Sequence, residues 1–331
     1  MELITPQYYH QFRCIASACP DSCCKEWAVD VDAEAAARYR ALSGPLGDRL
    51  RQVLTDTEDG TVMTIENGRC PMWRQDGLCR IQAELGHEAL CQVCRDFPRL
   101  RHDYGQLVEV GLELSCPEAA RLILSQESDQ VTTEQLPGGE PVEDPEALEI
   151  LRRSRDTALA ILESNIYSLP QTLAILLLYG HDVQGELDGA EAAIFVSDEL
   201  LSDAAKYAQA GSIAPIFQFF STLEILTEPW RELLTYTGTS PAWPVVLRRF
   251  VRYMIRRYWL QAVSDYDLIC RVKFIISACL LLAHMAGDPA QNAQLFSKEI
   301  ENDPDNVEAL LDAAYTCPAF TDTQLLGLLM L

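Results

Sequence analysis

The sequence predicts a mainly α protein, in which a cysteine-rich N-terminal module with a small β-hairpin precedes an all-α helical bundle. Nine of the 12 cysteines lie at or before position 116, and the residues after about 145 show the apolar spacing of successive helices. The segment between these two regions is rich in Pro, Gly and acidic residues, which is typical of a loop. We therefore expect a metal- or cluster-binding module over 1–125, a linker or long loop over 126–145, and a helical domain over 146–331.

Within the module, the apolar pattern over 33–54 predicts a helix. The segment GRCPMWRQDGLCRI predicts two short strands joined by a turn at Asp76-Gly77, because this dipeptide favours hairpin turns. A further helix is expected over about 81–93, and another directly after Cys116.

After the linker the sequence predicts one helix after another. Asp288-Pro289 and Asp303-Pro304 each place a capping residue before a proline at the first helical turn. The predicted helices cover about 145–166, 169–180, 189–209, 212–236, 244–262, 265–287, 289–302, 305–316 and 321–331.

Composition restricts the class of partner. The chain has 331 residues, of which 48% are hydrophobic and 23% charged, as expected of a globular protein with a full core. Its formal net charge of −23 repels nucleic acid and anionic lipid. We therefore expect no nucleic-acid partner.

The start of the chain, MELITPQYYHQFRC, lacks the charged and apolar regions of a signal peptide. The longest apolar run, 274–287, is shorter than the roughly 18–20 residues that cross a bilayer. These features predict a cytoplasmic protein without a transmembrane segment.

Cysteines are densest over residues 14–24, CIASACPDSCC, where Cys14, Cys19, Cys23 and Cys24 have the spacing C-x4-C-x3-CC. Thiolates this close together repel one another unless they share a cation. Zinc or an iron–sulfur cluster supplies that charge, and four thiolates commonly bind either one. In a reducing compartment such a group favours metal binding over disulfides, and the spacing does not distinguish zinc from iron.

The remaining cysteines fall into two sets. A dispersed set can complete the first site or build a second one, and it consists of Cys70, Cys79, Cys91, Cys94 and Cys116. Cys270, Cys279 and Cys317 lie in apolar helical segments and are expected to be buried hydrophobes.

An arginine-rich stripe stands out in this acidic chain. Arg248, Arg252 and Arg256 share one helical face in VVLRRFVRYMIRRYW, residues 245–259. Guanidinium groups match carboxylates, so Arg252 and Arg256 are candidates for binding a carboxylate-bearing cofactor or an acidic partner. Internal salt bridges are the competing interpretation.

Other side chains near the cysteines are weaker candidates. Tyr8, Tyr9, Trp27 and Trp73 are candidates for the walls of a substrate or cofactor pocket, with core packing as the alternative. Among the five histidines, His102 is the one candidate for a site role, because it lies next to Arg99 and Arg101 and close in sequence to Cys94. The glycine-rich turn of a doubly wound nucleotide-binding fold is missing from the sequence.

A family resemblance rests on an ordered set of motifs: C-x4-C-x3-CC-x2-W at 14–27, GRCPMWRQDGLCRI, CRDFPR at 94–99 and SCPE at 115–118. Together they resemble the flagellin lysine-N-methylase family, and the cysteine-rich part also resembles a broader group of zinc- or iron-chelating proteins with a CxxxCxxCC pattern. The later segments YDLICRVKFIISACLLL and LFSKEIENDPDNVEALL are similar to the C-terminal half of the same family.

The resemblance implies a protein-lysine N-methyltransferase that transfers a methyl group from S-adenosylmethionine to flagellin and depends on a [4Fe-4S] cluster, with zinc as the alternative. The implied metal ligands are Cys14, Cys19, Cys23, Cys24, Cys70, Cys79, Cys94 and Cys116, whereas Cys91 is an addition to the pattern. Two hypotheses from other classes stay open: a non-catalytic zinc-binding interaction module, and an iron-handling or electron-transfer protein.

Overall fold

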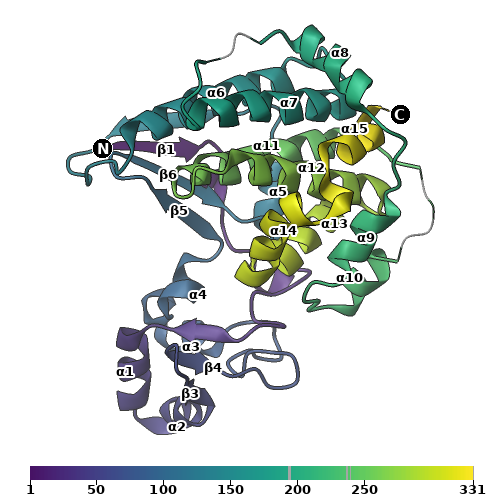
Figure 1. Cartoon of the computed structure of the whole chain (residues 1–331). Helices are drawn as coiled ribbons and strands as arrows, with labels where there is room; N and C mark the ends of the chain where they lie inside the picture. Colours follow the sequence, from purple (N-terminus) through teal and green to yellow (C-terminus); the bar gives the residue numbers. More distant parts are fainter. Residues whose placement is uncertain (193–194, 236–237, 239, 331) are drawn as a thin grey trace.

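The computed structural model describes residues 1–192, 195–235, 238 and 240–330. Figure 1 shows a small lobe that contains α1 to α4, beside a larger body that carries the long helices. The prediction of a mainly α protein with small N-terminal strands is confirmed. The helices predicted over 189–209, 212–236 and 321–331 extend over residues 193–194, 236 and 331, which lie outside the described residues.

The small lobe has a core of its own, which includes Leu50 and Met72. Three of its strands form an antiparallel sheet in the order β2-β4-β3, with Met63 opposite both Val29 and Leu54. In chain order its elements are β2 (Val29–Val31), α1 (Ala33–Ala41), α2 (Gly44–Val53), β3 (Leu54–Asp56), β4 (Thr61–Met63), α3 (Arg80–Leu85) and α4 (Gln92–Asp96).

The helix predicted over 33–54 is present as two helices, α1 and α2, separated by Leu42 and Ser43. Asp32 caps α1, since its side chain accepts a hydrogen bond from the Ala35 N–H at 2.9 Å. Pro45 lies in the first turn of α2, where its missing N–H allows a helix to begin but not to continue from a preceding turn.

The turn predicted at Asp76-Gly77 is present, and the backbone pairs across it: the Arg74 N–H donates to the Leu78 carbonyl at 2.9 Å and the Arg80 N–H to the Met72 carbonyl at 2.7 Å. This pairing amounts to one antiparallel bridge, between Trp73 and Cys79, and not to two regular strands. The Cys70 N–H, just before it, donates to the Cys24 carbonyl at 2.8 Å and joins this segment to the cysteine loop. The regular hairpin of the module consists of β3 and β4.

A four-stranded sheet lies in the larger body. Across the sheet its strands are β5 (Arg99–Asp103), β6 (Leu107–Leu112), β1 (Glu2–Pro6) and β7 (Val131–Gln135). β1 is parallel to β6 and antiparallel to β7. The segment 126–145, predicted as a linker or long loop, therefore contains an edge strand.

The helices of the body begin largely as predicted. Asp144, Asp288 and Asp303 each accept hydrogen bonds from the first N–H groups of the next helix, which has a proline in its first turn. The helices are α5 (Pro117–Ser125), α6 (Pro145–Glu163), α7 (Leu169–Leu187), α8 (Ser197–Tyr207), α9 (Ala214–Phe220), α10 (Glu228–Leu233), α11 (Val245–Tyr258), α12 (Leu268–His284), α13 (Pro289–Phe296), α14 (Pro304–Thr316) and α15 (Asp322–Met330).

The main core of the body draws on the chain from both sides of the predicted linker. Ile4, Leu112 and Leu122 pack in one cluster with the helices that follow residue 145. α12 is buried along its whole length, and Cys270 and Cys279 are buried within it, as expected of small hydrophobes. The domain boundaries at 125 and 145 stay predictions.

No described helix combines the length and the apolar character that a bilayer crossing requires.

Candidate functional site

Six cysteines from four separate segments meet in the small lobe, and we call them the six-thiol group: Cys23, Cys24, Cys70, Cys79, Cys91 and Cys94. The sulfur atoms of Cys23 and Cys24 are 4.0 Å apart. Cys23 and Cys24 share a hydrogen bond in which either sulfur can be the donor, and Cys24 in turn interacts with Cys70. The fold thus brings the CC pair of the first motif against the second set of cysteines.

Cys91 and Cys94 lie at the start of α4 and contact each other. The hydrogen bond that Cys94 donates lowers the pKa of Cys91 to about 7. The same bond raises the pKa of Cys94, as do burial and the neighbouring thiols of Cys24 and Cys23. Cys91 is outside the family-like set but lies inside the six-thiol group. Its C-x2-C spacing to Cys94 is the sequence signal that indicates this place.

The three other predicted ligands, Cys14, Cys19 and Cys116, form a second set that we call the three-thiol group. Burial raises the pKa of Cys116 to about 11, with a contribution from Cys19 and Cys14. Burial also raises the pKa of Cys19, and both Cys14 and Cys23 add to that effect. Cys19 therefore lies between the two groups.

The chemistry of these donors fits a thiolate-bound metal centre. The main influences on the pKa of the six thiols are burial, hydrogen bonds and other thiols, and no described Lys or Arg is among them. So many thiolates can form together only if another positive charge is present, and a metal ion or cluster would supply it.

All 12 cysteines are free thiols. In the described part of the chain, no three His, Cys, Asp or Glu side chains form a ready site for a single metal ion. The ligand set, and the choice between zinc and an iron–sulfur cluster, stay predictions.

Lys298 ties the first cysteine loop to the helical body. Its side chain is only 2% exposed, and its Nζ lies 2.8 Å from Asp21 Oδ2 and 2.7 Å from Glu26 Oε2. The same ammonium lies 5.3 Å from the ring centre of Trp27. Because the two carboxylates flank Cys23 and Cys24 in sequence, this contact sets where that loop sits on the body.

The position of Lys298 depends on an irregular element. Residues Ser297–Glu301 form a π-helix directly after α13, and all five are buried. Such one-turn insertions are rare and often occur at functional sites. Sequence analysis missed Lys298, although a lysine in the family-like segment LFSKEIENDPDNVEALL was visible.

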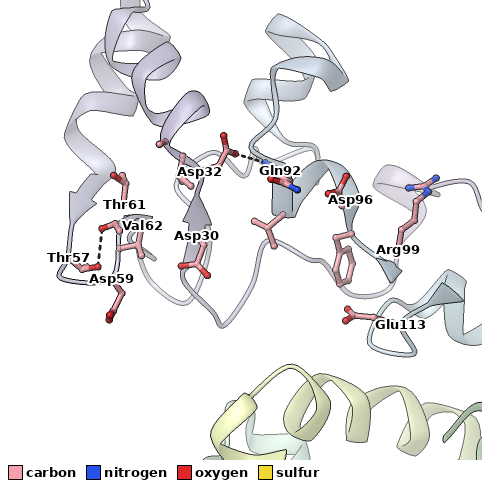
Figure 2. A pocket seen from close by; sticks show the side chains of 15 residues that line it. Asp30, Asp32, Thr57, Asp59, Thr61, Val62, Gln92, Asp96, Arg99 and Glu113 are labelled. Atoms are coloured by element: carbon pink, nitrogen blue, oxygen red, sulfur yellow. Dashed lines mark hydrogen bonds between the residues drawn. The ribbon is translucent and has the colours of Figure 1, made fainter. Parts of the chain in front are cut away.

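A cleft of about 1080 Å³ opens beside the cysteines, and we call it the interlobe cleft. Figure 2 shows Asp30 and Asp59 of the small lobe facing the same open space as Glu113 of the body. One wall is α4, through Gln92 and Asp96. The lining is strongly acidic, and sequence analysis did not identify this site, because its residues come from distant segments.

Glu113 links the interlobe cleft to a buried ionic network. Burial raises the pKa of its carboxyl group, which Arg257 partly offsets from 3.5 Å. Ser115 donates a hydrogen bond to Glu113 at 3.4 Å. Arg257 also pairs with Glu301 at 3.3 Å, so the network reaches the π-helix.

The two arginines predicted to bind a cofactor have internal partners. Arg252 Nε lies 2.5 Å from Glu163, and its other nitrogens donate to backbone carbonyls of 126 and 127. Arg256 donates to Asp129 at 2.9 Å. Internal salt bridges of this kind are what the competing interpretation of the arginine stripe expects. They hold residues 126–129 against α11. The cofactor role of Arg252 and Arg256 stays a prediction.

The four aromatic candidates do not line one pocket. Tyr8 and Tyr9 pack against the main core of the body. Trp27 lies beside Lys298, and Trp73 is covered by the guanidinium of Arg69 at 3.8 Å.

His102 lies on β5 with its Nε2 atom buried and without a hydrogen-bond partner among the described residues. It faces a cavity of about 40 Å³ between the sheet and α11, not the cysteines. Burial lowers the pKa of His102.

The structure thus defines a class: a mainly α protein whose thiol-rich lobe adjoins an acidic cleft. The chain is 32% identical over 133 residues to the flagellar biosynthetic protein FliU of Salmonella muenchen, a match that covers 36% of this chain and 75% of that protein. It belongs to the flagellin lysine-N-methylase family.

Two further relatives are the lysine-N-methylases of Salmonella typhimurium and Salmonella choleraesuis, each 32% identical over 133 residues. Each match covers 36% of this chain and 32% of the relative, so the chain spans about a third of the length of these enzymes. No family model and no solved structure matches the chain.

Proposed function

We propose that this protein is an S-adenosylmethionine-dependent protein-lysine N-methyltransferase that acts on flagellin in the cytoplasm and requires a [4Fe-4S] cluster held by its N-terminal cysteines. The observation that carries this proposal is the 32% identity to two proteins named lysine-N-methylase. The convergence of the family-like cysteines Cys23, Cys24, Cys70, Cys79 and Cys94 in one group supports the cluster.

The ligands of a [4Fe-4S] cluster would come from among these five thiols, with Cys91 beside them and Cys19 at the neighbouring three-thiol group. If three cysteines held the cluster, its fourth iron would supply an anchor for S-adenosylmethionine without a doubly wound fold. The chain's own contribution is to fix the cysteine loop, which the contact of Lys298 with Asp21 and Glu26 does.

The lysine that accepts the methyl group must be in its neutral form. Lysine Nε is protonated in water, with a reference pKa of about 10.4, so it must lose its proton before it can accept a methyl group. An apolar surrounding favours the neutral amine, because desolvation disfavours the charged form. The reactive position should therefore be less acidic than the cleft that leads to it.

The test is methylation of flagellin by anaerobically purified, cluster-loaded protein with S-adenosylmethionine, followed by mass spectrometry of the flagellin peptides. We expect added methyl groups on surface lysines with wild type and with Cys279→Ser, because Cys279 is buried in α12 away from the cysteine groups. We expect none with Cys23→Ser. If cluster-loaded wild type leaves flagellin unmodified, the proposed methyltransferase activity is contradicted. If the purified protein holds stoichiometric zinc and no iron, the result favours a non-catalytic zinc-binding module.

A further inference from the structure

The interlobe cleft is a ligand-sized space whose two sides belong to different lobes. Its volume of about 1080 Å³ lies just above the range for small-molecule sites, which is roughly 300–1000 Å³. The small lobe contributes β2, the β3–β4 turn and α4, and the body contributes Arg99 and Glu113. An extended chain segment would contact both lobes at once.

The charge of the cleft selects the kind of ligand. Asp30, Asp59 and Asp96 are exposed, and none of them has an ion-pair partner among the residues that the structure describes. Arg99 is the one basic residue of the lining, and its guanidinium lies over the ring of Phe12 at 5.2 Å. Unpaired carboxylates facing one space create a negative potential that attracts a cationic side chain.

The cleft also offers apolar surface beside these carboxylates. Val93 is 49% exposed, which makes it one of the few large hydrophobic side chains left open to water, and Phe97 lines the same space. A lysine side chain combines a four-carbon apolar stem with a terminal ammonium, so it matches a surface of this composition.

The cleft lies one short helix away from the six-thiol group. Gln92, Val93 and Asp96 of α4 line the cleft, while Cys94 of the same helix and Cys91 just before it belong to the thiol group. A ligand in the cleft would thus lie close to the proposed cluster. This placement is independent of the charge of the cleft.

We propose that the interlobe cleft binds a lysine-bearing extended segment of the protein substrate, with the ammonium beside the unpaired carboxylates of Asp30 and Asp59 and the stem against Val93 and Phe97. This inference rests on the proposed function, because it assigns the substrate site of that enzyme. Carboxylates stabilise the protonated amine, so these residues recruit the lysine and do not activate it.

The test is a binding measurement that needs no methyl transfer. Anaerobically purified full-length protein is titrated into a fluorescein-labelled peptide with one central lysine among Ala, Ser and Gly, and fluorescence anisotropy is followed. A second peptide has norleucine in place of lysine. The cleft variant is Asp30→Asn/Asp59→Asn, and the matched control is Glu134→Gln/Glu140→Gln, which removes two exposed carboxylates near the opposite end of the body sheet.

We expect the lysine peptide to bind wild type and the control alike, the cleft variant to bind about tenfold more weakly, and the norleucine peptide to lose affinity to a similar degree. Equal affinities of the cleft variant and the control, or the absence of binding to wild type, would overturn the cleft assignment. Either result leaves methylation of flagellin by the loaded wild type to decide the proposed function separately.

Discussion

At the scale of single residues, Lys298 is the side chain on which the thiol-rich loop depends most. Its ammonium is buried, with Asp21 and Glu26 as partners that are 24% and 28% exposed. Replacing Lys298 by Met would leave Glu26 without its counter-charge and Asp21 with Lys25 alone, at 3.4 Å, while water would compensate part of the loss. We expect the free energy of unfolding in urea to fall by about 1–3 kcal/mol.

The same change tests the link to the metal. If Lys298 positions the cysteine loop, Lys298→Met should retain less iron and sulfide per chain after anaerobic purification, and Lys298→Arg should recover part of it. Lys206→Met is the matched control, since Lys206 is 68% exposed and pairs only with Asp203 in the same helix. Unchanged stability together with unchanged iron in Lys298→Met would contradict the positioning role.

At the scale of elements, Asp322 joins three helices of the body. Its carboxylate lies 2.9 Å from Lys273 of α12 and 2.9 Å from His181 of α7, at the first residue of α15. Burial acts to raise the pKa of Asp322, but the hydrogen bond with His181 and the ion pair with Lys273 outweigh it and lower the pKa to about 2. These contacts therefore stabilise the fold while the carboxyl group is ionised.

The lowered pKa of Asp322 determines how the stability of the fold changes with pH. An acid whose pKa is depressed in the fold contributes stability above its ordinary value of 3.8 and loses it as the pH falls through about 2. Asp322→Asn should therefore be less stable than wild type at pH 7, by about 1 kcal/mol after allowance for its partial exposure. In urea unfolding the difference in stability should shrink as the pH falls below 3.8 towards about 2. A difference that grows on acidification would contradict this account.

The elements that sequence predicted well are those with local signals. The helix starts at 289 and 304 follow from Asp-Pro pairs whose side-chain caps are observed. The body sheet escaped prediction because β1 pairs with β6 about a hundred residues away, and short strands carry little periodicity. The predicted turn at Asp76-Gly77 is observed, but its pairing stops at one bridge because the Cys70 N–H donates to the Cys24 carbonyl.

At the scale of the whole molecule, one part of the candidate site could be predicted from the sequence and another part could not. The cysteines were predictable because few cytosolic proteins place so many thiols in so short a segment. The sequence could not predict the six-thiol and three-thiol groups, the interlobe cleft or the contact of Lys298, because each depends on how segments distant in sequence meet. Cys91 is an addition to the family-like pattern, and it lies beside Cys94, as its C-x2-C spacing allows.

The net charge of −23 and the acidic cleft also predict how the proposed methyltransferase activity should respond to salt. If Asp30 and Asp59 hold the substrate equally in the ground state and the transition state, the Asp30→Asn/Asp59→Asn variant should raise KM for flagellin about three- to tenfold with kcat nearly unchanged. Added salt screens exposed charges, with a Debye length of about 8 Å at physiological ionic strength, so wild-type KM should rise with salt.

The variant should show a flatter salt dependence of KM, because the charges that salt screens have already been removed, whereas Glu134→Gln/Glu140→Gln should behave as wild type. Initial rates at several flagellin concentrations between low and physiological salt measure this difference. A lower kcat with unchanged KM would instead place Asp30 and Asp59 at the reacting amine. That result would contradict recruitment, because a carboxylate there acts on the proton of the lysine and not on its arrival.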